Sequence, residues 1–275
     1  MKKRIFIGFF IGCVVLTASI ICFVEPYFRS ASLCRDIEAG QTEEAIIKIE
    51  NMNDVNCGTA PKFMKPMLNV FEHNIDLPLV VACKNGNYQV AEKLLRKGAD
   101  PNKYYEGGFT AVEAVFVSDS QNELAMIKLL ANYGADVTKA ESASSPLFKA
   151  ARKMIYTKNA ERKSYLSECI KYLLMFDKNL VDEKGISILH YAVIVDDISL
   201  TEQLLEEKQL INLTTDNGQT ALFEAVKNNS YEAVKLLVNS GIEISKEDST
   251  GRTAYDYAVE RGFDDVALLL EESLE

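Results

Sequence analysis

The stretch "LPLVVACKNGNYQVAEKLLRKGADPN" (Leu77–Asn102) decides the fold. A first helix-forming run breaks at Asn85-Gly86, and a second run of helical periodicity ends at Gly98. Two short helices joined by a glycine turn cannot bury a shared apolar face on their own. Such a unit is stable only when copies of it stack, so the stretch predicts a repeat protein.

The same pattern returns along the rest of the chain. Later copies begin at "GFTAVEAVF" (Gly108–Phe116), "GISILHYAV" (Gly185–Val193), "GQTALFEAV" (Gly218–Val226) and "GRTAYDYAV" (Gly251–Val259). Their equivalent apolar positions are spaced by 33, 35, 42, 33 and 33 residues, and these positions are Leu79, Val112, Leu147, Leu189, Leu222 and Tyr255. Three intervals of 33 residues indicate a genuine repeat.

This pattern resembles the ankyrin repeat family, whose unit of about 33 residues starts T-P-L-H-x-A. The resemblance implies an all-α ankyrin-repeat solenoid of about seven repeats over residues 36–275. The first, at residues 36–56, is degenerate, and the last ends in the acidic residues that a cap requires. It also implies that protein partners are bound by the loops between repeats, called fingers, and by the first helices.

Scaffold residues at fixed repeat positions agree with this interpretation. A small residue lets neighbouring helix pairs close up, a hydroxyl precedes most first helices as an expected N-cap, and glycine ends several second helices. The three sets are Ala82, Ala150, Ala192, Ala225 and Ala258; Thr110, Ser145, Ser187, Thr220 and Thr253; and Gly98, Gly134 and Gly241. In its repeat, Val115 occupies the first of these positions in place of alanine.

The N-terminus reads "MKKRIFIGFFIGCVVLTASIICFV" (Met1–Val24), and residues 5–24 carry no charge. A helix of that length spans about 30 Å, enough for a bilayer core. Basic residues stay on the cytoplasmic side. We therefore expect a cytoplasmic basic tip at residues 1–4, a transmembrane anchor at residues 5–24, and a linker and start of the cap at residues 25–35. The protein would be a single-pass inner-membrane protein of a bacterium, with its C-terminal domain in the periplasm.

Two alternatives remain open for this segment. A signal peptide cut near Thr17 or Ser19 would release the protein into the periplasm, and Gly12-Cys13 resembles the end of a lipoprotein signal. All three interpretations place the rest of the chain outside the cytoplasm. Gly8 and Gly12 form a G-x-x-x-G spacing that could pair two membrane helices into a dimer, although glycine is common in membrane helices anyway.

Charge and cysteine content limit the classes of partner. The formal net charge of −10 argues against nucleic acid and anionic lipid and favours a basic protein partner, with solubility as the plain alternative. Outside residues 5–24, the cysteines lack metal-ligand spacing, so no zinc is expected. They could form two disulfides or remain as buried thiols; they are Cys34, Cys57, Cys83 and Cys169.

Nothing in the sequence has the arrangement of an active site. His190 stands where the ankyrin pattern itself has histidine, and His73 has no nucleophile or carboxylate in an activating arrangement. "YYEGGFT" lacks the lysine of a phosphate-binding loop. We therefore predict no enzyme, no cofactor and no metal.

The predicted binding surface consists of finger residues. Aromatic side chains dominate interface energetics, and acidic ones steer a basic partner. The aromatic candidates are Tyr104, Tyr105 and Phe109, and the polar and acidic candidates are Asp182, Glu183, Asp216, Asn217, Glu247 and Asp248.

An insertion of nine residues around residues 151–166 explains the 42-residue interval and is expected to lengthen two helices. It forms a basic island, which either docks a partner or is a pair of solvated helix ends; its members are Arg152, Lys153, Lys158, Arg162 and Lys163.

A rigid acidic binding protein that is fixed at the membrane and carries no chemistry of its own is suited to sequestering another protein. The function predicted is therefore an immunity protein that covers a toxic effector, with a lipase as one candidate class. The alternative is an envelope scaffold that organises or protects one of the cell's own proteins.

Overall fold

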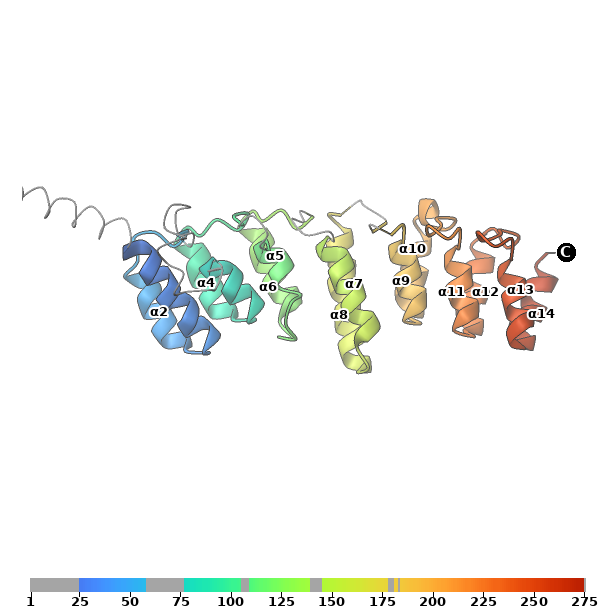
Figure 1. Cartoon of the computed structure of the whole chain (residues 1–275), viewed down its shortest axis with the longest axis horizontal. Helices are drawn as coiled ribbons and strands as arrows, with labels where there is room; N and C mark the ends of the chain where they lie inside the picture. The colour runs from blue at the N-terminus through green and yellow to red at the C-terminus, as the bar shows by residue number, and fades with distance from the viewer. Residues whose placement is uncertain are drawn as a thin grey trace, which may run out of the picture. The chain divides into compact units, whose positions relative to one another are not determined.

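The computed structural model describes residues 25–57, 77–104, 109–138, 145–177, 181–182 and 184–274. The chain divides into two compact units, residues 1–137 and 138–275, and the regular elements described in both are helices (Figure 1). Among the described helices, none is long and apolar enough to cross a bilayer. The predicted anchor at residues 5–24 lies outside the described residues, as do Gly8 and Gly12.

The described residues of the first unit form three helical pairs. Residues 25–38 are helical and bury Leu33 and Ile37, so the stretch expected to be a linker and the start of a cap is part of the first helix. The helices that follow are α2 (Thr42–Glu50), α3 (Pro78–Lys84), α4 (Tyr88–Arg96), α5 (Ala111–Ala114) and α6 (Glu123–Asn132). Helices α3 and α5 contact each other, as do α2 and α4 and then α4 and α6, which gives two layers.

The second unit repeats this arrangement with four pairs. They are α7 (Pro146–Tyr156) with α8 (Ala160–Leu174), α9 (Ile188–Ile194) with α10 (Ile198–Leu205), α11 (Ala221–Lys227) with α12 (Tyr231–Asn239), and α13 (Ala254–Arg261) with α14 (Asp264–Glu272). A short 3₁₀ turn, η2 (Lys208–Leu210), follows α10. The first helices α7, α9, α11 and α13 contact one another in chain order, and α10, α12 and α14 do the same in the second layer.

The core lies between successive pairs, at the positions that the repeat spacing predicts. All five alanines of the small-residue set have no exposed surface, and Val115, which replaces alanine in its repeat, is 1% exposed. The close approach of the first helices therefore depends on side chains that add little bulk between them.

The helix ends agree only partly with expectation. Thr110, Ser187 and Thr253 form capping boxes. Ser145 and Thr220 also precede helices, but their side chains make no capping hydrogen bond within the described residues, so the N-cap prediction is wrong for these two. Glycines end the second helices α4, α6 and α12 with φ of 89°, 83° and 85°, as predicted; they are Gly98, Gly134 and Gly241.

The pair α7–α8 is longer than its neighbour in the second unit. Helix α7 has 11 residues and α8 has 15, whereas α9 has 7 and α10 has 8. Figure 1 shows the joined ends of α7 and α8 extending past those of α9 and α10. The nine-residue insertion thus lengthens two helices, as predicted.

Candidate functional site

Three fingers of the second unit share one backbone geometry. They are residues 182–186, 215–219 and 248–252, and each immediately precedes a first helix. In each finger the backbone N–H of the first residue donates to the carbonyl oxygen of the fifth, over 3.0, 2.9 and 2.8 Å respectively. The fingers are therefore closed loops held at a fixed place beside α9, α11 and α13.

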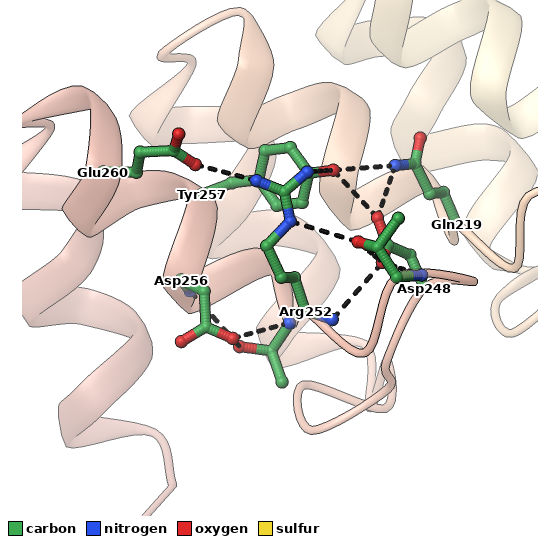
Figure 2. A network of polar contacts seen from close by, with 8 residues as sticks. Gln219, Asp248, Arg252, Asp256, Tyr257 and Glu260 are labelled. Carbon is green, nitrogen blue, oxygen red and sulfur yellow. Dashed lines mark hydrogen bonds and ion pairs between the residues drawn. The ribbon is translucent and has the colours of Figure 1, made fainter.

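Asp248 ties the last finger to α13 and to the middle finger (Figure 2). Its Oδ1 accepts hydrogen bonds from the Thr250 hydroxyl at 2.6 Å and the Thr250 N–H at 2.8 Å. Its Oδ2 accepts from the Tyr257 hydroxyl at 2.8 Å and from Gln219 Nε2 at 3.0 Å. The Thr250 hydroxyl, with help from Gln219 and Tyr257, holds the pKa of the Asp248 carboxyl well below its usual range.

This geometry corrects the prediction that Asp248 is a free charge on the rim of the site. The residue is 7% exposed, and both of its carboxylate oxygens are engaged. Arg252 completes the network by lying over the Tyr257 ring, 4.3 Å from its centroid, while its guanidinium donates to Glu260 over 2.9 Å (Figure 2). The carboxylate of Asp248 fixes the finger, and it is not free to attract a partner.

Asp182 holds the first of these fingers in the same way. Its Oδ1 accepts from the backbone N–H groups of Lys184 and Ile186, each at 2.9 Å, and its Oδ2 accepts from the Tyr191 hydroxyl at 2.9 Å and Arg152 at 3.2 Å. Its side chain has no exposed surface. Burial alone raises the pKa of Asp182, but these hydrogen bonds hold the pKa below its ordinary value. The prediction of a rim charge is therefore corrected here as well.

The two fingers reveal an aspartate–tyrosine clamp that sequence reasoning missed. In both, an aspartate at the start of the finger receives the hydroxyl of a tyrosine nine residues later, in the next helix. The pairs 182/191 and 248/257 lie two repeats apart, and this recurrence is the signal that could have revealed the clamp. The middle repeat has Thr215 and Glu224 at these positions, and there Lys227 joins Glu224 (2.8 Å) to Gln219 (2.7 Å).

The remaining polar candidates stay exposed. Asp216 and Asn217 lie on the middle finger, and Glu247 directly precedes the last one. The carbonyl oxygen of Asn217 accepts a hydrogen bond from the N–H of Ser249 at 2.8 Å, which links these two fingers. The three side chains therefore form an accessible polar surface on a braced backbone, while Glu183 lies outside the described residues.

The aromatic candidates belong to the first unit. Tyr104 and Phe109 are each half-buried, and Tyr105 lies outside the described residues. The structure brings Asp216, Asn217 and Glu247 together on adjoining fingers of the second unit.

The described residues include His190 and several potential metal ligands. No group of three or more potential metal ligands is found there. His190 is buried, with Nδ1 2.7 Å from the Ser187 hydroxyl and Nε2 3.0 Å from the Gln219 carbonyl oxygen, and burial lowers its pKa. It is therefore a structural residue that caps α9 and holds the next finger, whereas His73 lies outside the described residues.

The four cysteines among the described residues are thiols. Cys34, Cys83 and Cys169 are buried and Cys57 is partly exposed, and none forms a disulfide. Burial raises the pKa of Cys83 well above its usual value. The three buried cysteines act as small core side chains, which was one of the two predicted states.

Two family models match the chain. The model for ankyrin repeats in three copies matches residues 159–248 and 196–275, and the model for a single ankyrin repeat matches residues 76–104. Among curated proteins, the chain is 26% identical over 216 residues to an ankyrin repeat and KH domain-containing protein, mask-1 of Caenorhabditis elegans. That alignment covers 70% of this chain but only 8% of the nematode protein.

Solved structures share the fold at low identity. The human ASB11 ankyrin repeat domain superposes with a TM-score of 0.64 at 21% identity, covering 86% of this chain and 96% of that domain. One chain from a complex of a predatory endopeptidase of Bdellovibrio bacteriovorus with an immunity protein gives a TM-score of 0.57 at 22% identity. It covers 70% of this chain and 96% of its own length.

Proposed function

Because this chain belongs to the ankyrin repeat family and is a protein-binding ankyrin module, we propose that it is an immunity protein. It would be held at the inner membrane through residues 5–24, face the periplasm, and block a toxic effector by binding over that effector's functional surface. The chemistry lies in the partner, and the ankyrin chain contributes only recognition.

The single observation that carries this proposal is the braced acidic surface of the second unit. The clamps at Asp182 and Asp248 use buried charge to fix the fingers, and they leave Asp216, Asn217 and Glu247 exposed. Binding by a surface that is already ordered avoids the entropic cost of ordering loops on association. Exposed carboxylates speed the encounter with a basic partner through long-range attraction.

Two further points support the immunity role. The same fold occurs in a complex whose components are an immunity protein and an endopeptidase, so an ankyrin stack is compatible with this kind of partnership. The uncharged segment at residues 5–24 would place the module where effectors that damage the cell envelope act. A lipase remains one candidate class for the effector.

Site-specific photo-crosslinking in living cells tests the proposal. A crosslinking amino acid is placed at Asn217 on the middle finger, and a matched one at Glu202, an exposed residue of α10. We expect position 217, and not position 202, to capture a secreted toxin whose activity the purified full-length protein inhibits. Capture at 217 of one of the cell's own enzymes, with its activity unchanged, would replace the immunity role with that of an envelope scaffold.

A further inference from the structure

A positively charged protrusion stands at the far end of the pair α7–α8. We call residues 153–163 the tip; it comprises the end of α7, the connection at residues 157–159 and the start of α8. Helix α7 is four residues longer than α9, which carries its end about 6 Å farther. Tyr156, the last residue of α7, is 84% exposed, which is unusual for an aromatic side chain in a folded protein.

The charge of the tip is opposite to that of the chain. Glu161 is its only acidic residue, whereas the whole protein carries a net charge of −10. Arg152 lies just before the tip, and its guanidinium contacts Asp182 at 3.2 Å. In sequence, the tip carries four basic residues against this one acidic residue; they are Lys153, Lys158, Arg162 and Lys163.

A complementary pocket lies elsewhere in the same unit, between α12 and α14. It has a volume of about 280 Å³ and is lined by Tyr231, Asp265, Leu268, Leu269 and Glu272. Leu268 is 54% exposed and Tyr231 is 42% exposed, so apolar surface faces solvent here. Asp265 and Glu272 stand at either end of the apolar residues on α14. The pocket therefore sets two carboxylates beside exposed apolar side chains.

We propose that the tip of one copy of this chain docks into the α12–α14 pocket of a second copy. Tyr156 would cover Leu268 and Leu269, and the lysines around it would face Asp265 and Glu272. A chain cannot join its own tip to its own pocket, because α9, α10 and α11 lie between the two in the contact order of the unit. The association would be head to tail, so each added copy offers one free tip and one free pocket.

A second copy suits the tip better than a lipid surface does. Insertion into a bilayer needs a broad apolar face, as on an interfacial amphipathic helix. At the tip, the neighbouring Met154 is fully buried and Ile155 is half-buried, so Tyr156 is the large apolar side chain that protrudes. One aromatic residue among lysines matches a small pocket that sets carboxylates beside leucines more closely than it matches a membrane.

Mixing two variants of the full-length protein, each in detergent, tests this inference by analytical ultracentrifugation. Tyr156→Ala with Lys158→Glu disables the tip, and Leu268→Lys with Glu272→Lys disables the pocket. All four side chains are exposed, so folding should survive both changes. A matched control, Tyr88→Ala with Lys208→Glu, makes the same substitutions on exposed residues that belong to neither surface.

We expect the wild type and the control to associate as concentration rises, and more weakly as salt rises. Each disabled variant should associate at least tenfold more weakly. An equimolar mixture of the two variants should form a one-to-one dimer and stop there, because only one intact tip and one intact pocket remain per pair. A wild type that stays monomeric, or a mixture that does not dimerise, overturns the proposal. So does tip-dependent binding to phosphatidylglycerol vesicles without self-association.

Discussion

At the scale of single residues, the clearest feature of this protein is that two acidic side chains of the predicted binding surface stabilise its structure. Asp182 and Asp248 look in sequence like Asp216, since all three lie in polar fingers. Asp182 and Asp248 differ from Asp216 because folding brings hydrogen-bond donors to their carboxylates. These donors include the hydroxyls of Tyr191 and Tyr257. A sequence can place an aspartate in a finger, but it does not show which donors will surround it.

Asp248→Asn should therefore destabilise the protein at neutral pH. Removing a buried charged hydrogen-bond partner costs about 1–3 kcal/mol in the free energy of unfolding. The folded pKa of Asp248 is lower than the unfolded value of about 3.9, so the unfolded chain binds more protons. The stabilisation is complete above the unfolded pKa and is lost as pH falls through the folded one.

Urea unfolding at pH 7 and at pH 3 measures this effect. The difference in the free energy of unfolding between the wild type and Asp248→Asn should be smaller at pH 3 than at pH 7. Asp216→Asn is the control, because Asp216 is exposed, and its unfolding midpoint should stay close to that of the wild type at both values. Equal losses for the two variants would mean that the clamp does not stabilise the finger.

At the scale of elements, the repeat spacing predicted the helical pairs, whereas the contacts between neighbouring pairs depend on packing that the spacing does not show. The turn between α3 and α4 illustrates this point. A Cβ added to Gly86 would lie 2.0 Å from the Cβ of Ser120, which belongs to the loop before α6 in the next repeat. The glycine is needed both for its φ of 66° and for the close approach of two turns, and only the first need is visible in sequence.

Gly86→Ala should accordingly destabilise the first unit more than Gly98→Ala does. Both glycines have positive φ, but a Cβ on Gly98 would meet nothing within 4 Å. Both variants carry the strain of placing alanine at a positive φ. The difference between their free energies of unfolding therefore isolates the contact between the two turns. Thermal unfolding of both variants measures the difference, and equal shifts would mean that the turns do not pack as described.

Ala225→Leu tests the stacking of first helices in the second unit. Ala225 lies on α11, which contacts both α9 and α13, and it has no exposed surface. Three added carbons have no space there, and overpacking of this kind costs about 1–3 kcal/mol. Lys246→Ala, at a partly exposed residue of the loop between α12 and α13, should change stability by less than about 0.5 kcal/mol. Similar losses at both sites would show that the repeat register is wrong.

At the scale of the whole molecule, the sequence predicts most of the fold and less of the site. Six equivalent positions from Leu79 to Tyr255 were enough to predict the stacked pairs, because repeat contacts are local in sequence. The exposed set that remains, Asp216, Asn217 and Glu247, emerges only when three-dimensional contacts separate bracing carboxylates from accessible ones. The predicted membrane topology rests on residues 5–24 and is a separate question.

That topology has a direct test. A reporter enzyme that is active only outside the cytoplasm, fused after Glu275, should be active, and the fusion should remain in the membrane fraction at full length. The same reporter placed after Arg4 is the inactive control. Release of a shortened soluble protein would favour the cleaved signal, and an inactive C-terminal fusion would contradict the periplasmic placement.

We propose that the braced fingers of the second unit hold a basic protein partner, and the affinity for the effector captured at position 217 tests this proposal most directly. Asp216→Lys with Glu247→Lys reverses the exposed finger charges, and Glu202→Lys with Glu206→Lys makes the same change on exposed residues at α10. We predict at least a tenfold loss of affinity for the finger variant, mainly through slower association and more strongly at low salt. The α10 variant should stay within about twofold of the wild type. Unchanged affinity in the finger variant, or an equal loss in both, would contradict the account.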